Sequence, residues 1–558
     1  MPRSSPHPSA LFSLRPYNDE KQRGKGVVED ARNSHLVSAH PGGGFALDVG
    51  FNIRSKSSTT TLATLGRGDT DIHISGGSIA RIQCSFEVDL QTGIVMLYDR
   101  SHSQTTQVFG EFATPFELGR SRKVVVQKNL NTIIGMGGVG RNLVMFELIW
   151  HQNPLETMRQ VNDRYQKIGD YEENPCLACT IVDDTETVPP TRAVTRIHTP
   201  AGRAQPLRIR YAKIPPQLGA GTYGVVHRAV DVDSGKLIAV KILKRPGSPN
   251  LQQWRVQLKR EVDFLSQLDH PHIVPLIALQ KWDEPEVEII MELQHGSLES
   301  LVTGKSFDKQ ELQQIAVLVF HHSLQALDRI NLLGLIHRDM KPANILFKEL
   351  HGQYVFLLAD FGLSNHTSVA HTFMGSPVYM APEMFEKGCQ QTHKVDVWAL
   401  FVTMMWTLDI GGFRQLVEKA KSLGDLEEIR KEVLSGARKP NLSSIQEMAI
   451  EDPAKRASAA QMLVKCFNGE GLSTPRNKIA ALIETPSTVP NVRRDTQPDG
   501  RKVAARVSLR TGTSSLLPQT RSRARNAGIK KLQNKAPGPM ARYLIPMPGN
   551  FPEEDAKP

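Results

Sequence analysis

Between about Tyr211 and Phe467, two hydrophobic periods follow one another in a fixed order, and this order constrains the fold more than any other feature. Short segments rich in β-branched residues come first (VVHRAVD, KLIAVKIL and VEIIMEL) and predict strands. Long amphipathic segments follow, such as residues 309–333, and predict helices. Because strand-like and helical segments are segregated, we expect an α+β unit with a small β-rich lobe and a larger helical lobe.

The flanking regions differ in composition from this central part. Residues 1–44 are rich in Ser, Pro, Gly and His and predict a disordered segment. Residues 45–151 contain short strand-like runs such as RIQCSFEV and VMFELIW and predict an all-β sandwich. A linker at 152–207 precedes the α+β unit at 208–467, and the polar segment 468–558 predicts a disordered tail.

Composition excludes several classes of protein. No apolar run reaches the roughly 18 residues of a membrane-spanning helix, and five cysteines in 558 residues are too few for a disulfide scaffold. We therefore expect an intracellular protein without a membrane partner. The net charge of +11 lies mainly in residues 471–558, which hold 16 Lys and Arg against six Asp and Glu. A solvated tail is the simpler interpretation. Nucleic-acid binding or a nuclear address is the alternative, and the scarcity of aromatic residues in the tail weakens nucleic-acid binding.

A glycine-rich motif, LGAGTYGVV, opens the strand-rich part at residues 218–226. Glycines let backbone amides approach phosphate oxygens because no Cβ intervenes. Such a motif alone also fits an ordinary hairpin turn or a dinucleotide fingerprint, but the dinucleotide motif expects a helix next. Here a strand, a turn at 233–235 and a second strand follow, which favours a lid over a nucleotide.

Charged residues recur at defined places after this motif. Lys241 ends the apolar run Ile238-Ala-Val-Lys241, where an unpaired lysine would be costly; Glu261, in the next helical segment, is its expected partner. An acid, a base and an amide then stand within six positions in LIHRDMKPANIL (335–346). Asp339 can accept a proton from an alcohol, Lys341 can neutralise charge on the transferred group, and Asn344 can ligate a metal ion.

Further charged residues follow the segment at 335–346. Asp360, in Asp-Phe-Gly, follows the apolar run VFLLA and is placed to hold Mg²⁺; Ala381-Pro-Glu383, Asp396 and Arg456 follow. In this order and spacing the motifs resemble those of eukaryotic protein kinases over about residues 211–467. The sequence DMKPAN at 339–344 is similar to that of serine/threonine kinases. The resemblance implies ATP and Mg²⁺ as cofactors and protein hydroxyls as substrates.

The resemblance also implies roles for individual residues. Asp339 is expected to be the catalytic base, Lys341 to assist it, and Asn344 and Asp360 to hold Mg²⁺. Lys241 would contact the phosphates and pair with Glu261. Glu383 would pair with Arg456, and Asp396 would anchor the catalytic loop. The ATP site would comprise Leu218, Gly219, Gly221, Gly224, Val226, Ala239, Lys241, Met291 (at the back of the pocket), Glu292, Leu293 and Leu346.

The segment HTFMGSPVY at 371–379 resembles a kinase activation loop. Ser376 occupies the position of a hydroxyl that contacts the catalytic Asp and Lys. Arg338 precedes Asp339, and in kinases such an arginine pairs with a phosphate on the activation loop. Thr372 is the first candidate for that phosphate, with Thr367 and Ser368 as alternatives.

The N-terminal sandwich resembles a forkhead-associated (FHA) domain, which binds phosphothreonine through loops at one end. Gly66-Arg67, Ser78 and Thr105 match its motif residues. Two positions depart: Arg81 stands for the family histidine, and Ser103-Gln104 for its Asn-Gly. Arg67 and Arg81 could clamp a phosphate, and a solvated arginine pair is the alternative.

Together these features predict a multidomain protein: an FHA-like sandwich, a bilobal kinase domain and disordered termini. An FHA-like module before a serine/threonine kinase resembles checkpoint kinases of DNA-damage and cell-cycle signalling. That architecture implies docking on a phosphothreonine-containing partner, and a nuclear location in preference to the cytoplasm. The alternative is a catalytically inactive kinase-fold scaffold, although no lysine, aspartate or metal ligand of the motif is missing.

Overall fold

The computed structural model describes residues 2–482 with several gaps. The gaps are residues 19–22, 41, 91, 152–195, 198–206, 222–223, 246, 248–250, 266–267, 351, 361–376, 387–390 and 421–422. Within the described ranges, none of the helices is both long enough and apolar enough to cross a bilayer.

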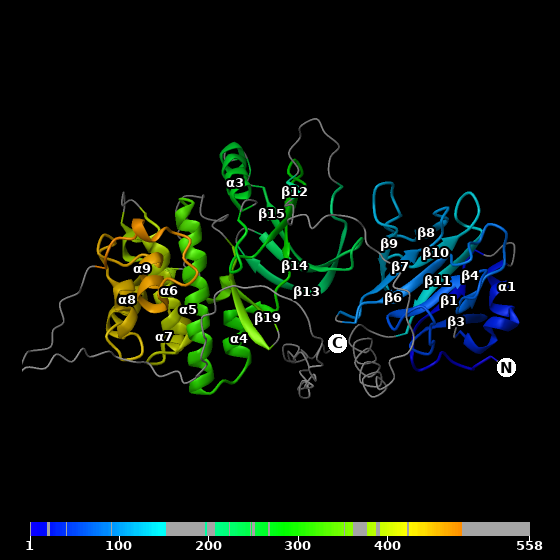
Figure 1. Ribbon diagram of the computed structural model, residues 1–558, viewed down its shortest axis with the longest axis horizontal. Helices are drawn as coiled ribbons and strands as arrows, with labels where there is room; N and C mark the ends of the chain where they lie inside the picture. The colour runs from blue at the N-terminus through cyan, green and yellow to red at the C-terminus, as the bar shows by residue number, and fades with distance from the viewer. Residues whose placement is uncertain are drawn as a thin grey trace, which may run out of the picture. The chain divides into compact units, whose positions relative to one another are not determined.

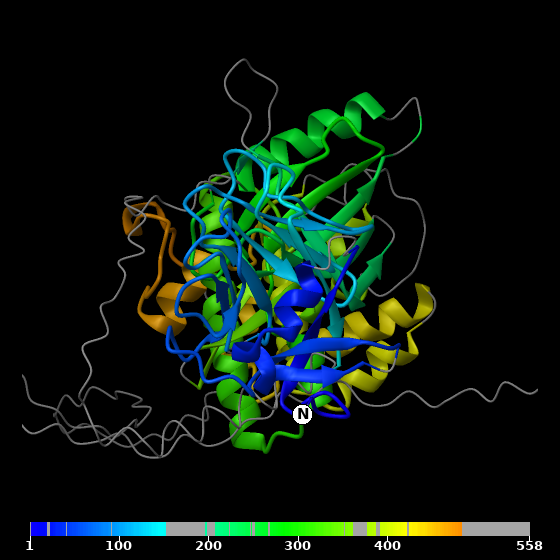
Figure 2. The ribbon, with the colours of Figure 1, turned by 90° about the vertical axis from the view of Figure 1, so that its right-hand side faces the viewer.

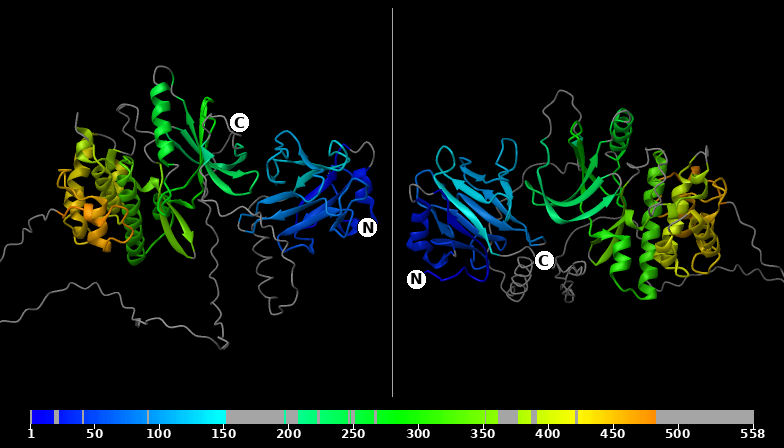
Figure 3. Two further views of the ribbon diagram at one scale, coloured as in Figure 1. Left: turned by 45° about the horizontal axis from the view of Figure 1, so that its top comes forward. Right: turned by 180° about the vertical axis from the view of Figure 1, so that it is seen from behind.

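The N-terminal domain consists of two β-sheets (Figures 1 and 3). One has the strand order β2-β3-β1-β11-β10-β8 and the other β5-β4-β6-β7-β9. The strands are β1 (Ala10–Pro16), β2 (Val37–Ala39), β3 (Phe45–Gly50), β4 (Thr61–Gly66), β5 (Ile72–His73), β6 (Cys84–Val88), β7 (Val95–Asp99), β8 (Thr106–Phe109), β9 (Lys123–Val126), β10 (Ile133–Met136) and β11 (Val144–Trp150). Phe12, Phe86 and Phe146 are fully buried in one shared apolar core. The predicted all-β domain is confirmed.

The prediction that residues 1–44 are disordered is wrong. Strand β1 pairs with both β3 and β11 and is therefore an interior strand of its sheet. Its apolar residues Leu11, Phe12 and Leu14 are completely buried, and α1 (Arg23–Glu29) and a 3₁₀ helix (Ala31–Leu36) follow it. The domain therefore begins well before residue 45, because the short run ALFSL supplies core side chains that offset the cost of ordering it.

The small lobe of the second domain has a six-stranded sheet of order β12-β16-β17-β15-β14-β13. Its elements are β12 (Arg196–Ile197), β13 (Tyr211–Gly221), β14 (Gly224–Asp231), β15 (Leu237–Lys244), α3 (Leu251–Leu265), β16 (Leu276–Gln280) and β17 (Glu286–Glu292). Leu258 and Val262 of α3 pack against the sheet, and Figure 2 shows this helix beside the strands. Strand β12 pairs with β16, so residues 196–197 belong to this sheet and not to a linker. Residues 152–195 lie outside the description.

The large lobe is built around helix α5 (Lys309–Leu332), whose N-terminus is closed by a capping box of Asp308 and Glu311. Helix α6 (Lys394–Thr407) is buried along almost its whole length. The other elements are β18 (Gly296–Ser297), α4 (Leu298–Gly304), β19 (Ile345–Leu350), β20 (Gln353–Leu358), α7 (Phe413–Lys419), α8 (Leu423–Gly436), α9 (Ala459–Phe467) and short 3₁₀ helices at Pro342–Asn344, Pro377–Tyr379, Pro382–Phe385, Ser443–Ala449 and Arg476–Lys478. The predicted order of a β-rich lobe and a helical lobe is confirmed.

The first part of the predicted disordered tail is ordered. Asp328 of α5 is fully buried and accepts hydrogen bonds from the backbone N–H groups of Ser473 (2.7 Å) and Thr474 (2.9 Å). The Thr474 hydroxyl donates to the same carboxylate at 2.6 Å, and Leu472 packs on the large-lobe core. Residues 468–482 therefore extend the domain past 467, since a buried aspartate needs these donors. Residues 483–558 lie outside the description.

Candidate active site

The glycine-rich motif lies on the β13–β14 hairpin, as predicted. Gly219 pairs with Val226, and Gly221 pairs with Gly224 across the turn; residues 222–223 are outside the description. A Cβ on Gly224 would lie 2.1 Å from the Ile242 carbonyl oxygen of β15, so this position excludes any side chain. Leu218, at the start of the motif, is 51% exposed. The hairpin thus presents backbone and one apolar side chain beside the strand that carries Lys241.

Lys241 lies on β15, opposite Val226 of β14, and is 8% exposed. Its Nζ is 2.5 Å from Oδ1 of Asp360, so the structure brings together a lysine and an aspartate 119 positions apart. Asp360 has φ +59°, a left-handed conformation that an aspartate tolerates better than most residues. Glu261 lies in α3, but its side chain is outside the description, so its predicted pairing with Lys241 stays a prediction.

The catalytic-loop residues predicted from the sequence converge on one carboxylate. Asp339 Oδ2 accepts hydrogen bonds from Lys341 Nζ at 2.9 Å and from Asn344 Nδ2 at 2.8 Å. The Asn344 amide also donates to the Asp339 carbonyl at 2.7 Å. Asn344 is connected to the Asp360 segment as well, because its carbonyl accepts from Ala359 N–H at 2.9 Å. The acid, the base and both predicted metal ligands therefore lie at one site.

A buried aspartate holds this loop in place, as predicted. Asp396, on α6, is 2% exposed and accepts from the backbone N–H of His337 (2.8 Å) and of Arg338 (2.7 Å). Burial raises the pKa of the Asp396 carboxyl, and the His337 and Arg338 groups around it act in the opposite direction. The two N–H donors let the carboxylate fix a turn in which Arg338 adopts φ +67°.

His337 has a supporting role that the sequence analysis did not assign. Its ring is fully buried. Nε2 lies 2.8 Å from the Ala359 carbonyl, and Nδ1 lies 3.3 Å from the Asp339 backbone N–H. The imidazole therefore joins the loop of Asp339 to the strand end before Asp360. Its place directly before Arg-Asp was the available signal, but sequence alone does not show what a histidine ring touches.

Arg338 is half-buried, and its Nε is buried without an acceptor among the described residues. A buried guanidinium N–H without an acceptor is costly, so this group suits an anionic partner. The predicted activation-loop residues Thr372 and Ser376, together with Thr367 and Ser368, lie in 361–376 and are outside the description. Their positions stay predictions.

The predicted adenine pocket is partly assembled. Ala239 of β15 pairs with Met291 of β17, and Met291 and Leu346 pack against the same apolar cluster. Glu292 and Leu293 follow Met291 and are half-buried. The cluster also contains three buried residues that the sequence analysis did not single out, Val274, Leu357 and Ala359. No periodic signal separates such residues from ordinary core positions.

The predicted Glu383–Arg456 pair is confirmed. The guanidinium makes two parallel hydrogen bonds to the carboxylate, at 2.6 and 2.9 Å, and both side chains are almost completely buried. Arg456 also donates to the carbonyls of Ile450, Lys394 and Glu451. The pair therefore ties the segment after the activation loop to the last turn before α9.

The FHA-like candidates gather at one end of the sandwich. Arg67 and Arg81 are exposed neighbours, because Arg67 N–H donates to Ala80 and Gly68 N–H to Arg81. A Cβ on Gly66 would lie 2.3 Å from the Arg81 carbonyl, which explains the glycine before Arg67. Ser78 Oγ accepts from Gly138 N–H at 3.2 Å.

Half-buried Thr105 belongs to the same group of loops, since its carbonyl accepts from Gly137 N–H at 2.9 Å. Gln104, at the position of the glycine in the FHA motif, has φ +50°. Arg141, which the sequence analysis missed, donates to the Gln104 carbonyl at 2.9 Å and adds a third arginine at this end.

Comparisons with known proteins agree with the geometry of the second domain. Residues 212–467 match the family model of the protein kinase domain. The chain is 35% identical over 191 residues to serine/threonine-protein kinase TAO3 of Mus musculus, which covers 34% of this chain and 20% of that protein. It is 32% identical over 210 residues to the NUAK family SNF1-like kinase 1 of Homo sapiens, covering 37% of this chain and 30% of that protein. The chain thus spans between a fifth and a third of these relatives. Residues 212–467 therefore match the protein kinase domain family, and the TAO3 relative is a serine/threonine kinase.

The buried Glu383–Arg456 pair gives a stability prediction. Glu383→Ala should lower the free energy of unfolding by about 3–5 kcal/mol, because it leaves a buried guanidinium without its counter-charge. Urea unfolding followed by tryptophan fluorescence measures the change. Glu447→Ala is the control, since its 2.7 Å pair with Lys465 is partly exposed and should contribute below about 1 kcal/mol. Equal effects of the two substitutions would contradict the prediction.

Proposed function

We propose that the protein transfers the γ-phosphoryl group of ATP to serine and threonine hydroxyls of protein substrates. The observation that carries the proposal is the convergence of Lys341 and Asn344 on the Asp339 carboxylate. Asp396 fixes the loop from beneath, and the kinase-domain match covers all of these residues. Because these groups are held before any substrate arrives, little reorganisation is needed when it binds.

Each residue has a defined task in the proposed reaction. The Asp339 carboxylate orients the substrate hydroxyl and accepts its proton. Its side chain is 20% exposed, so a hydroxyl can reach it from solvent. Lys341 holds Asp339 at 2.9 Å, and its positive charge neutralises the transferred group. Lys241 positions the phosphates from β15.

The residues present fit Mg²⁺ and ATP. Asp360 offers a carboxylate and Asn344 an amide oxygen, which are the hard oxygen donors that Mg²⁺ prefers. When bound, the metal ion neutralises charge on the phosphates. Lys241 Nζ contacts a carboxylate oxygen of Asp360, so its ammonium lies beside one of the proposed metal ligands. Asp360 and Asn344 are therefore the residues that would hold the metal.

Asp339→Asn should lower the rate of phosphate transfer by about 10²–10⁴-fold while leaving the fold intact. The amide keeps the shape but cannot accept a proton, and a general base contributes about 10²–10⁴-fold. Transfer from labelled ATP with Mg²⁺ to a mixed protein substrate measures it. Asp283→Asn is the control, since Asp283 is exposed and pairs only with a surface arginine among the described residues.

The alternative is a kinase fold that binds without catalysing. Label absent from the wild type, even after treatment with an activating kinase, would favour this scaffold. Retained label in Asp339→Asn would contradict the assigned base. Label on Ser and Thr that disappears in the variant supports both the enzyme and the base.

Phosphorylation of Thr372 should activate the enzyme. The Nε of Arg338 is buried without an acceptor among the described residues, and a phosphate would supply one. Thr372→Ala should lower the rate of transfer by about fivefold to a hundredfold, the range of such couplings. Phosphosite mapping and steady-state assays test it, with Thr367→Ala and Ser368→Ala as matched variants. Unchanged activity in Thr372→Ala alone would move the assignment to one of these two.

A second candidate function is phosphothreonine-dependent docking by the sandwich, in line with the FHA resemblance. Arg67, Arg81 and Ser78 lie on neighbouring exposed loops, and Thr105 is tied to the loop that contacts Ser78. Two arginines beside hydroxyl groups form a suitable phosphate clamp. Such docking would recruit the kinase to a phosphorylated partner, as in checkpoint signalling, and that pathway is part of the proposal.

Arg67→Ala should weaken binding of a phosphothreonine peptide by about tenfold to a hundredfold, since hydrogen bonds to charged groups contribute about 1.5–3 kcal/mol. Fluorescence anisotropy of a labelled peptide library, phosphorylated and unphosphorylated, measures binding to the full chain. Arg430→Ala is the control, because Arg430 is a partly exposed arginine of α8 in the large lobe, where its Nε donates to Glu451 at 2.7 Å. Equal binding of both peptide forms by the wild type would exclude this function.

A further inference from the structure

The sandwich and the small lobe share one apolar core. Val230 and Val232, at the end of β14, are fully buried and belong to the cluster that fills the sandwich. Ala212, Ile214 and Leu237, from β13 and the start of β15, pack against the same cluster. Val230 of β14 and Val232 of the following turn (residues 231–236) therefore insert into the core of the other domain.

The hairpin turn also completes a sheet edge. Strand β9 is the last strand of its sheet, and an unpaired edge strand would present free backbone groups. The N–H of Val125 in β9 donates to the Val232 carbonyl at 2.9 Å. Val232 therefore occupies part of this edge.

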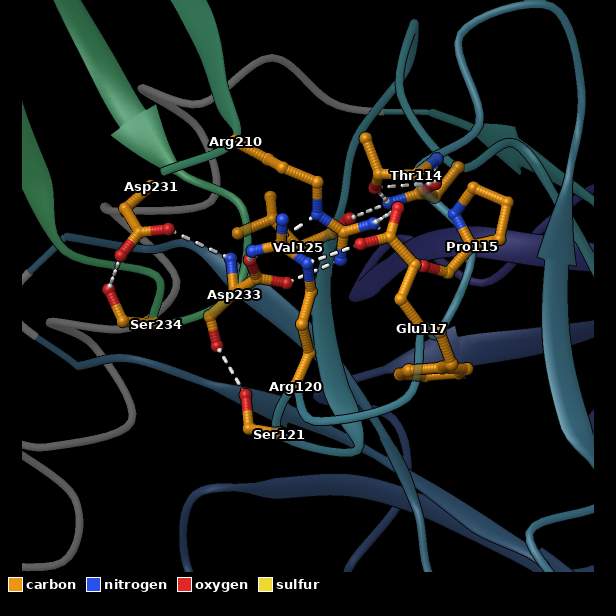
Figure 4. A network of polar contacts seen from close by, with 12 residues as sticks. Thr114, Pro115, Glu117, Arg120, Ser121, Val125, Arg210, Asp231, Asp233 and Ser234 are labelled. Carbon is orange, nitrogen blue, oxygen red and sulfur yellow. Dashed lines mark hydrogen bonds and ion pairs between the residues drawn. The ribbon is translucent and has the colours of Figure 1, made fainter. Parts of the chain in front are cut away.

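Charged groups surround this backbone contact (Figure 4). Asp233 accepts from Arg120 Nη1 at 2.9 Å and from Arg210 Nη2 at 2.5 Å. Arg120 also donates to Glu117 at 2.6 Å and to the Arg208 carbonyl at 2.9 Å, and Arg210 donates to the Pro115 carbonyl at 2.7 Å.

Asp233 is 16% exposed, and Arg120 and Arg210 are 10% and 14% exposed. Water therefore weakens the electrostatic attraction between these charges only slightly. The hydrogen bond from Arg120 and the charge of Arg210 hold the pKa of Glu117 below its usual range. The network crosses the boundary between the domains at low exposure, unlike a surface ion pair.

One short segment, residues 120–122, contacts both the turn of the kinase domain at residues 231–236 and the loop that contains Thr105. Arg120 and Ser121 contact Asp233 of the kinase hairpin. Arg122, the next residue, donates to Asp99 and to the carbonyls of Gln104 (3.2 Å) and Thr106 (3.0 Å). Those carbonyls flank Thr105.

On the kinase side, the clamped turn joins β14 to β15, and the glycine-rich turn lies at the opposite end of β14. Strands β13 and β14 pair from Tyr211–Asp231 to Gly221–Gly224, and β15 carries Lys241 opposite Val226. A paired hairpin moves as a unit, so a displacement at residues 231–236 shifts the glycine-rich end as well.

We infer that Arg120, Ser121 and Arg122 form a connector through which the phosphopeptide end of the sandwich positions the glycine-rich hairpin of the kinase domain. The inference deepens the proposed function and rests on it for the identity of the two ligands. The contact itself does not depend on either activity. Arg120 and Asp233 are positioning residues, since neither belongs to the nucleotide site.

Hydrogen–deuterium exchange of the full chain tests the contact without any ligand. Arg120→Ala and the conservative Asp233→Asn should speed exchange in residues 123–126 and 224–243 by about fivefold or more, the lower end of typical couplings. Arg32→Ala, which removes an exposed arginine from an Arg–Asp pair outside this network, should leave both segments unchanged. Exchange in Asp233→Asn and Arg120→Ala equal to that of the control would overturn the inference, whether or not the protein is a kinase.

A second experiment tests whether Arg120 transmits peptide binding to the hairpin or only stabilises the contact between the domains. A phosphothreonine peptide that binds the wild type should change exchange in 224–243 and the KM for ATP. In Arg120→Ala the peptide should bind with unchanged affinity but alter neither quantity. A peptide effect that persists in Arg120→Ala would overturn the connector. If no peptide binds, the docking proposal fails, and the first arm alone decides whether the contact exists.

Discussion

The Asp396 carboxylate is the constraint on which the catalytic geometry depends. It lies at the start of a buried helix and accepts the N–H groups of His337 and Arg338, so one side chain determines where the next residue, Asp339, stands. His337 in turn contacts Ala359, directly before Asp360. A single buried acid therefore sets the relation between the proposed base and a proposed metal ligand. Burial raises the pKa of the Asp396 carboxyl, and the two backbone N–H donors act in the opposite direction.

The local parts of this arrangement were predictable from sequence. Asp339, Lys341 and Asn344 lie within six positions, and turn geometry alone brings them close. Lys241 and Asp360 were recognisable because a charged residue within or directly after an apolar strand stands out. The order of strands and helices was also predictable, since periods of 2.0 and 3.6 residues separate the two lobes.

What could not be predicted depends on contacts across long sequence separations. Strand β1 was missed because its seven residues lie in a Pro- and Ser-rich segment, and its burial follows from pairing with β11 at residues 144–150. No sequence pattern indicates that Asp328 accepts a hydrogen bond from Thr474, which is 146 positions away. Arg120 and Asp233 are likewise ordinary surface types that become a buried network only when the domains meet. Periodicity carries no information about such pairs.

Exposure divides the ion pairs of the kinase domain into two kinds. Glu383–Arg456 is 4% and 0% exposed, so separating it would leave a charge in a medium that cannot solvate it. Lys241–Asp360 is 10% and 39% exposed, and Lys341–Asp339 is 23% and 20% exposed. Water reaches at least one partner in these two pairs, so they can exchange partners at low cost. In the proposed reaction, Lys241 would pass from Asp360 to a phosphate oxygen, and Asp339 would pass from Lys341 to a hydroxyl. The buried pair keeps the scaffold fixed, while the accessible pairs hold the groups that the proposed phosphate transfer requires to move.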